Sequence, residues 1–216
     1  MKGVKEKGSS WFLLGFIVFV IVAFFVFSFF VGFVFRVPSL DILEPVFVEE
    51  SLFTGFEKGS SPFSSVNFIM FGDSRCPYSS GMVNSVKSVY EYYKDDVNFV
   101  YKHFLIYEDS LKAAEAVECA FDQNLGWEFV FVLFENPDKH SVSDLRGYSS
   151  ELGLDSALFD SCLDSGIKAS VIEKDKNEAI IAGITGSPSF VIGGKKIVGF
   201  QTEAGLGLNI REAISR

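Results

Sequence analysis

A stretch of 25 residues without charge lies near the N-terminus. Residues 11–35 read WFLLGFIVFVIVAFFVFSFFVGFVF. As a helix this stretch is about 37 Å long, enough to cross a hydrocarbon core of about 30 Å with some tilt. A cleavable signal peptide has a shorter apolar region and a small-x-small cleavage site, and a buried globular helix has a polar stripe. We therefore expect an uncleaved transmembrane signal anchor at 11–35, after a tail at 1–10.

The charges on the two sides of this stretch predict its orientation. Lys2, Lys5 and Lys7 precede it, whereas Arg36 is the one basic residue directly after it and acidic residues follow. Cytoplasmic flanks of membrane spans carry an excess of Lys and Arg. The N-terminus is therefore expected in the cytoplasm and the rest of the chain outside the cell membrane, where disulfides are permitted.

The remaining composition argues against several classes of function. Residues 37–216 contain 15 basic and 27 acidic side chains, a net charge near −12, which is unsuited to nucleic acid. The two histidines, His103 and His140, lack ligand spacing, and three cysteines at intervals of 43 residues do not resemble a zinc ribbon. We expect no metal site and no cofactor.

The chain beyond the anchor changes from a linker to a folded domain. Residues 36–62 contain three prolines and the run Glu-Lys-Gly-Ser-Ser, which predicts a stalk, and the domain is expected over 63–216. Apolar runs at 66–71, 97–101, 189–192 and 196–200 predict strands, the last two joined at Gly193-Gly194-Lys195, and helical spacing recurs at 82–93, over most of 108–183 and from Thr202. This order predicts an α/β domain with one mixed sheet flanked by helices.

Cys76 occupies the point where the first predicted strand gives way to a helix. Pro77 follows it at the position where a missing backbone N–H costs nothing. Free N–H groups and the positive end of a helix favour an anion, so a thiolate is stabilised there relative to a thiol. A lone cysteine is more often a small buried apolar residue, but the Cys-Pro-Tyr sequence after an apolar strand favours a reactive sulfur.

Several segments together resemble one family. From about Gly59 to the C-terminus the chain is similar to the DsbA-like branch of the thioredoxin superfamily, which has a helical insertion, here at about 108–183. The similarity rests on Cys76-Pro77-Tyr78-Ser79, Gly186-Ser187-Pro188-Ser189-Phe190, the segment Gly194–Gly199, Glu118-Cys119-Ala120 and Cys162-Leu163-Asp164. The family pattern at the first of these is Cys-Pro-Tyr-Cys, which is matched at three of four positions.

The resemblance implies roles for specific residues. Cys76 would be the nucleophile and Pro188 a cis-proline facing it, while the backbone at Ser187, with Pro77 and Tyr78, would receive an extended peptide by strand-like pairing. The implied partners are unfolded or disulfide-bearing client proteins, recognised with little sequence selectivity.

Two positions depart from the family pattern. Ser79 replaces the second, resolving cysteine, and Met70 stands where the family commonly has a buried Glu that handles protons for that sulfur. A serine cannot store a disulfide, and a carboxylate without that sulfur would only carry a desolvation cost. The two changes agree with monothiol chemistry, in which an external thiol, a client thiol or a membrane redox partner releases Cys76. Ser79 either donates a hydrogen bond to the Cys76 thiolate or is simply a tolerated small polar residue.

The other two cysteines lie in the helical insertion. Cys119 and Cys162 either pair as a structural disulfide, which we favour in an oxidising compartment, or remain buried thiols, and a role in resolving Cys76 is the least favoured alternative. Lys102 either stabilises the thiolate or is an exposed charge at a strand end.

Two functions of different classes follow. The first is a membrane-anchored extracytoplasmic thiol-disulfide oxidoreductase, reductase-like or isomerase-like, that acts through Cys76. The alternative is a degenerate, non-redox module that uses the groove near Pro188 and Tyr78 to bind peptides or a membrane partner. An anchored peroxidase would need a peroxide pocket, which no sequence feature indicates.

Overall fold

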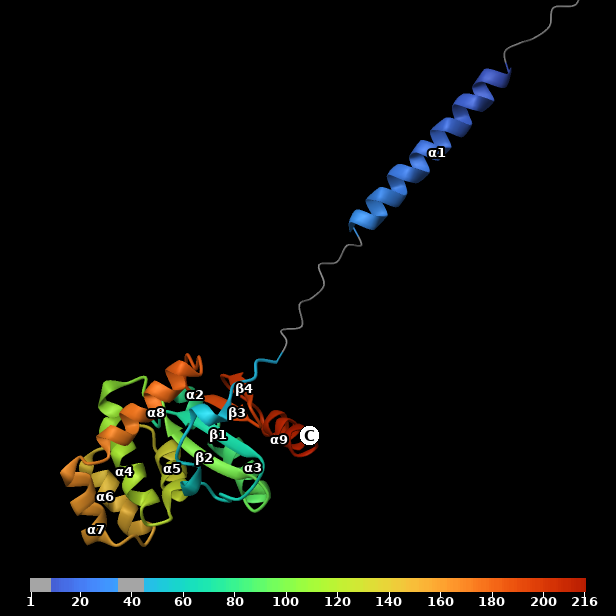
Figure 1. Ribbon diagram of the computed structural model, residues 1–216. Helices are drawn as coiled ribbons and strands as arrows, with labels where there is room; N and C mark the ends of the chain where they lie inside the picture. The colour runs from blue at the N-terminus through green and yellow to red at the C-terminus, as the bar shows by residue number, and fades with distance from the viewer. Residues whose placement is uncertain (1–8, 35–44) are drawn as a thin grey trace, which may run out of the picture. The chain divides into compact units, whose positions relative to one another are not determined.

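The chain divides after Glu44 into two compact units in the computed structural model, which describes residues 9–34 and 45–216. Helix α1 (Ser9–Val34) belongs to the first unit and is drawn in blue in Figure 1. Within the described side chains and backbone, we find no helix that combines the length and the apolar character needed to cross a bilayer. The membrane anchor at 11–35 stays a prediction.

Parts of the N-terminal predictions lie outside the described residues. These parts are 1–8 of the predicted tail and 35–44, which hold the end of the anchor and the start of the stalk. The side chains of residues 9–14 and 29–34 are also outside that description.

The second unit contains four strands and eight α-helices among its described residues. Three short 3₁₀ turns occur at Glu50–Leu52, Phe56–Lys58 and Glu108–Ser110. The strands are β1 (Asn67–Gly72), β2 (Asn98–His103), β3 (Ser189–Ile192) and β4 (Lys195–Val198). The helices are α2 (Pro77–Ser80), α3 (Val83–Tyr93), α4 (Leu111–Phe121), α5 (Gly126–Glu135), α6 (Val142–Glu151), α7 (Ser156–Ser165), α8 (Ala169–Ile181) and α9 (Glu203–Ile214).

The strands form one mixed sheet in the order β2-β1-β3-β4. β1 is parallel to β2 and antiparallel to β3, and β3 is antiparallel to β4. Gly193 and Gly194 both have positive φ in the turn that joins β3 to β4, as a tight two-residue hairpin requires. The expected mixed sheet flanked by helices, with helices α4 to α8 between β2 and β3, is confirmed (Figure 1).

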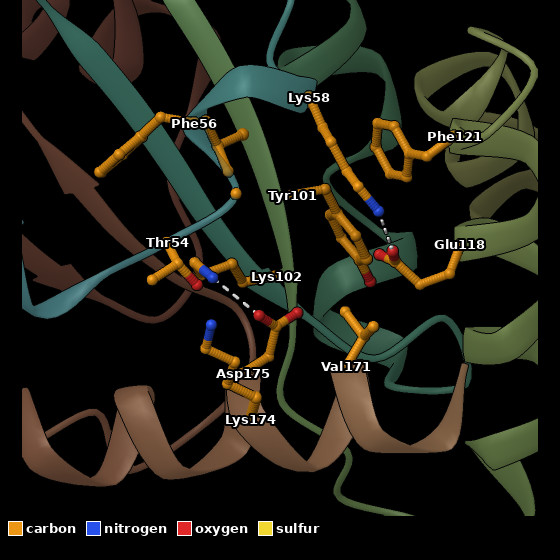
Figure 2. Close-up of a pocket in the computed structure, with 12 residues that line it drawn as sticks. Thr54, Phe56, Lys58, Tyr101, Lys102, Glu118, Phe121, Val171, Lys174 and Asp175 are labelled. Atoms are coloured by element: carbon orange, nitrogen blue, oxygen red, sulfur yellow. Dashed lines mark hydrogen bonds and ion pairs between the residues drawn. The ribbon is translucent and has the colours of Figure 1, made fainter. Parts of the chain in front are cut away.

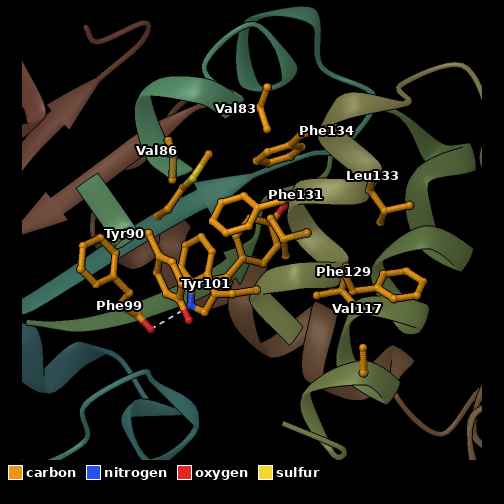
Figure 3. Close-up of a cluster of buried hydrophobic side chains, with 14 of the residues drawn as sticks. Val83, Val86, Tyr90, Phe99, Tyr101, Val117, Phe129, Phe131, Leu133 and Phe134 are labelled. Carbon is orange, nitrogen blue, oxygen red and sulfur yellow. Dashed lines mark hydrogen bonds between the residues drawn. The ribbon is translucent and has the colours of Figure 1, made fainter. Parts of the chain in front are cut away.

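The larger core lies between one face of the sheet and helices α3, α4, α5 and α9. Aromatic rings dominate it, and Figure 3 shows how they gather over the sheet. The indole Nε1 of Trp127 donates a hydrogen bond to the Phe99 carbonyl oxygen at 3.0 Å, which ties α5 to the edge strand β2. The core thus fixes the helical block against the strands whose ends carry the site.

The other face of the sheet is covered by α8 and by the segment before β1. Phe53 is buried against Phe71, with 5.5 Å between the ring centroids. The Val48 N–H donates to the Gly194 carbonyl oxygen at 2.8 Å, and the Lys196 N–H donates to the Val46 carbonyl oxygen at 2.7 Å. The structure therefore differs from the predicted stalk: residues 45–62 pack on the domain, because the open edge of β4 and the uncovered sheet face offer them backbone partners and apolar contacts.

Candidate active site

Cys76 lies between the end of β1 and the one-turn helix α2. Its backbone N–H donates to the Asp73 carbonyl oxygen at 3.0 Å, and Pro77 occupies the first helical position as predicted. The helix differs from the expectation in its length: α2 ends at Ser80, and α3 begins only at Val83. A helix stabilises an anion at its N-terminal end through the aligned dipoles of its peptide groups. Because α2 has only one turn, its contribution to the stabilisation of a Cys76 thiolate is small.

The Cys76 sulfur faces the loop before β3. Its Sγ donates to the Ser187 carbonyl oxygen at 3.2 Å, across 111 positions of sequence. The Ser187–Pro188 peptide bond is cis. The structure therefore brings Cys76, Ser187 and Pro188 together, although only 5% of the Cys76 surface is exposed.

Ser79 contacts the same loop rather than the thiol. Its side chain is fully buried, and its Oγ lies 2.7 Å from the Ser187 Oγ. The Ser187 Oγ also accepts the Asp73 backbone N–H at 2.9 Å. The Ser187 hydroxyl is thus the partner that the structure gives to Ser79, and the two alternatives for Ser79, a hydrogen bond to the Cys76 thiolate or a tolerated small polar residue, stay predictions.

Large apolar and aromatic side chains are exposed on segments that contact the Cys76 turn or the Pro188 loop. The Tyr78 side chain is 68% exposed, and Ile106, Tyr107, Val198 and Phe200 are also exposed. Exposed apolar and aromatic side chains of this kind are typical of a surface that binds a polypeptide with little sequence selectivity.

Two of the three cysteines form a disulfide, and the third is free. Cys119 on α4 and Cys162 on α7 form a disulfide with Cα atoms 5.9 Å apart. Cys76 is the free cysteine. In this state neither of the paired sulfurs is available to resolve an adduct on Cys76.

Met70 is fully buried in β1 beneath the site. It pairs in register with Tyr101 on one side and Phe190 on the other. Burial raises the pKa of the Tyr101 hydroxyl well above its ordinary value, with the Asp73 carboxylate adding to the rise. The position that holds a carboxylate in the family pattern is thus part of an apolar layer.

Lys102 lies in a buried group of charges on the α8 side of the sheet, which we call the ion cluster: Lys102, Asp175 and Glu178. The Lys102 Nζ lies 2.7 Å from Asp175 Oδ1 and 2.7 Å from Glu178 Oε2, and 2% of the Lys102 surface is exposed. Both expectations for Lys102 are therefore wrong, because its charge is neither exposed nor directed to the thiol. It is neutralised by the carboxylates of α8.

A second buried pair adjoins the ion cluster. The His103 Nε2 lies 3.1 Å from Glu118 Oε1, and the Lys58 Nζ donates to Glu118 Oε2 at 3.1 Å. Burial alone would raise the pKa of Glu118, but His103 and Lys58 outweigh it and lower that pKa to about 2. His103, Glu118 and Asp175 each present one ligand atom within 4.8 Å of the others. A cation entering there would compete with the Lys58 and Lys102 ammonium groups, which already pair with carboxylates of this group.

A cavity of about 390 Å³ lies beside these charges. Figure 2 shows the residues 54–58 on one side of it, β2 on another and α8 below, with Lys58 directed at Glu118 and Lys102 at Asp175. The residues that line it do not include those of the thiol site.

Asp73 is the functional candidate that sequence reasoning missed. It precedes Cys76 by three residues, and its buried carboxylate accepts hydrogen bonds from the turn around Cys76 and from the loop after β2. The available signal was an aspartate in a turn after a buried strand, a position where its side chain commonly bonds nearby backbone N–H groups.

Comparison with protein families and curated proteins gives two results. A family model described as Thioredoxin matches residues 59–211. The sodium/proton antiporter NhaA of Herminiimonas arsenicoxydans is 26% identical over 136 residues, which cover 63% of this chain and 22% of the antiporter. The antiporter NhaA 1 of Mycolicibacterium gilvum is 26% identical over 165 residues, covering 73% and 26%. This chain thus spans about a quarter of the length of the curated relatives it matches.

Solved structures share the fold. A thioredoxin-like oxidoreductase from Silicibacter pomeroyi superposes with a TM-score of 0.66 and 23% identity, over 78% of this chain and 99% of that one. BdbD from Bacillus subtilis gives a TM-score of 0.64 and 20% identity, over 75% and 96%. The thiol-disulfide exchange protein alpha-DsbA2 from Wolbachia pipientis gives 0.63 and 20%, over 69% and 82%.

Proposed function

Because this chain belongs to the thioredoxin family, we propose that it is a membrane-tethered, extracytoplasmic thiol-disulfide oxidoreductase that acts on protein disulfides through Cys76 alone. The observation that carries the proposal is the Cys76 sulfur, 3.2 Å from the Ser187 carbonyl oxygen in the loop before Pro188. A nucleophile beside a loop that leads into a strand can meet a disulfide in an extended peptide that pairs with that loop.

The proposed reaction needs one sulfur of the enzyme. The Cys76 thiolate attacks one sulfur of a client disulfide, a new sulfur–sulfur bond forms, the client bond breaks, and the second client sulfur leaves as a thiolate. A client thiol that attacks the mixed disulfide restores the Cys76 thiolate, with no net change in oxidation state, which is isomerisation. Two external thiols instead reduce the client by two electrons and become a disulfide themselves. Ser79 offers no sulfur for an internal exchange.

Membrane tethering and location rest on the sequence. Residues 11–35 lack charge, and lysines precede them. Expression of the full chain with a C-terminal epitope tests both parts. We expect the protein in the membrane fraction after alkaline carbonate extraction and the epitope to be digested by protease added to spheroplasts. A protein that alkaline carbonate extracts, or an epitope that resists external protease until the cells are lysed, would contradict the tether or the orientation.

The redox function is tested by the recovery of a client with scrambled disulfides in a glutathione buffer. We expect Cys76→Ala to reduce the rate to the uncatalysed background, because it removes the attacking sulfur. Ser80→Ala, one position beyond Ser79 on the same turn, is the matched control and should keep the wild-type rate. Recovery by Cys76→Ala at the wild-type rate would overturn the proposal.

The monothiol character has its own test. Ser79→Cys places a second sulfur three residues after Cys76, where the family pattern has its resolving cysteine. We expect this variant to lose two free thiols on mild oxidation and to show, on non-reducing peptide mapping, a disulfide between Cys76 and the introduced cysteine. The absence of any such disulfide would show that α2 does not hold the two positions as the proposal requires.

The burial of Cys76 favours a second candidate, a module that binds peptides or a membrane partner without redox turnover. An exposure of 5% and a thiol that donates to the Ser187 carbonyl oxygen are typical of a structural cysteine. The two functions differ in the behaviour of the thiol. A binding module keeps its capture of an unfolded polypeptide in Cys76→Ala, and its Cys76 resists iodoacetamide in the folded state.

A further inference from the structure

The side chain of Asp73 joins two segments of the chain. It is fully buried, and each of its carboxylate oxygens accepts two hydrogen bonds. Oδ1 accepts the Arg75 N–H at 2.9 Å and the Ser110 hydroxyl at 2.7 Å. Oδ2 accepts the Ile106 N–H at 2.8 Å and the Tyr107 N–H at 3.1 Å. The carboxylate therefore connects the turn that carries Cys76 with the loop that follows β2.

The backbone of Asp73 connects the same turn with the loop before β3. Its N–H donates to the Ser187 Oγ at 2.9 Å, and its carbonyl oxygen accepts the Cys76 N–H at 3.0 Å. Ser187 in turn supplies the carbonyl oxygen that accepts the Cys76 thiol. A displacement of Asp73 would thus move both partners of that thiol contact.

The second tie between the turn and the loop is weaker. The Arg75 Nη1 lies 2.8 Å from Asp109 Oδ2, but the two side chains are 36% and 62% exposed. Exposed ion pairs contribute little to stability, whereas a buried carboxylate is costly unless its hydrogen bonds are made. The three bonds from Ile106, Tyr107 and Ser110 to the Asp73 carboxylate are therefore the stronger side-chain contact between the turn and the loop.

That loop presents exposed apolar side chains. Ile106 and Tyr107, whose N–H groups bind Asp73, have exposed side chains, and they line a groove of about 590 Å³ with the start of α8. Since both acceptor positions on each Asp73 oxygen are occupied, the carboxylate is placed to orient these groups and not to transfer a proton.

We propose that Asp73 is a positioning residue that fixes the loop 104–110 and the Ser187 loop against Cys76, and so limits access to the thiol and shapes the surface that a client contacts. The part that concerns clients rests on the proposed redox function. The part that concerns thiol access does not, because it can be measured without any disulfide substrate.

Asp73→Asn and Asp73→Ala in the full chain test the proposal. Asparagine keeps one acceptor but turns an N–H₂ group toward N–H and O–H donors, and alanine removes both acceptors. Hydrogen exchange followed by mass spectrometry reports the loop 104–110, and the rate of iodoacetamide alkylation reports Cys76. We expect both rates to rise by at least about fivefold, the factor that corresponds to a local loss of about 1 kcal/mol. Client isomerisation should fall although the thiol reacts faster with iodoacetamide.

Glu115→Gln is the matched control, because Glu115 is a buried acid on α4 whose partner is Lys112. It should lower the midpoint of urea unfolding without changing Cys76 alkylation or exchange in the loop under native conditions. If neither Asp73 variant folds, Ser110→Ala removes one donor to the same carboxylate and should still raise exchange in the loop.

Folded Asp73 variants, or Ser110→Ala, whose loop exchange and Cys76 alkylation stay within about twofold of the wild type overturn the positioning role. Wild-type protein that does not isomerise any client, but whose Asp73 variants show faster loop exchange and alkylation, contradicts the redox function and leaves the positioning role in place.

Discussion

The thiol site and the ion cluster are both buried polar groups on the same sheet, and they are held by different forces. Around Cys76, Ser79 and Ser187 the contacts are hydrogen bonds between neutral groups. Around Lys102 the contacts are ion pairs of 2.7 Å with two carboxylates. The difference shows that a buried charge on a strand near the active-site motif can have a purely structural role, because its partners are the carboxylates of a neighbouring helix.

The energetic consequences of the two arrangements also differ. Removing one member of a buried ion pair leaves an uncompensated charge, whereas removing a neutral hydroxyl leaves at most one unsatisfied polar atom. Substitutions in the ion cluster should therefore act mainly on stability, and those in the thiol site mainly on reactivity.

The largest expected effect comes from Lys102→Met, which keeps the apolar stem and removes the charge. Asp175 and Glu178 would then face each other without a cation, and the free energy of unfolding should fall by about 3 to 5 kcal/mol. Urea unfolding measures this loss. Lys176→Met on the exposed face of α8 is the control and should change little. A Lys102→Met protein as stable as the wild type would show that the ion cluster does not stabilise the fold.

A smaller effect is expected from acid, through Glu118. Its pKa is lowered from 4.5 to about 2, so its contribution to stability is fully present above about pH 4.5 and is lost as the pH falls toward 2. That contribution is of the order of 3 kcal/mol. Urea unfolding between about pH 7 and pH 2.5 should show that the free energies of unfolding of the wild type and of Glu118→Gln become more similar as the pH falls. Parallel curves would contradict this role of the His103 and Lys58 contacts.

The smallest effect is expected from Ser79→Ala in the thiol site. It removes the 2.7 Å contact with the Ser187 hydroxyl, and the free energy of unfolding should fall by about 1 kcal/mol. The urea midpoint measures this change, and the alkylation rate of Cys76 shows whether the Ser187 loop has moved. A loss as large as that of Lys102→Met would remove the contrast between the two regions.

Local patterns were sufficient for much of the fold. The Gly193-Gly194 turn and the start of α9 after Thr202 depend on neighbours within a few residues, and the structure contains both of them. The segment 45–62 was predicted as part of a stalk because its prolines and glycines are typical of a flexible linker. Its actual contacts, such as those with Gly194 and Phe71, are with residues far away in the sequence.

The sequence by itself determined that a cysteine stands between a strand and a proline, that no second cysteine follows it within the same turn, and in which order the strands and helices occur, because these are properties of neighbouring residues. Only the tertiary structure decided that the Ser79 hydroxyl lies within hydrogen-bond distance of the Ser187 hydroxyl and that Lys102 forms ion pairs with carboxylates of α8. It also decided that Asp73 connects its own turn with the Ser187 loop and the loop after β2. Each of these contacts joins groups far apart in the chain, and a buried polar group accepts whichever distant partner the packing brings within hydrogen-bond distance.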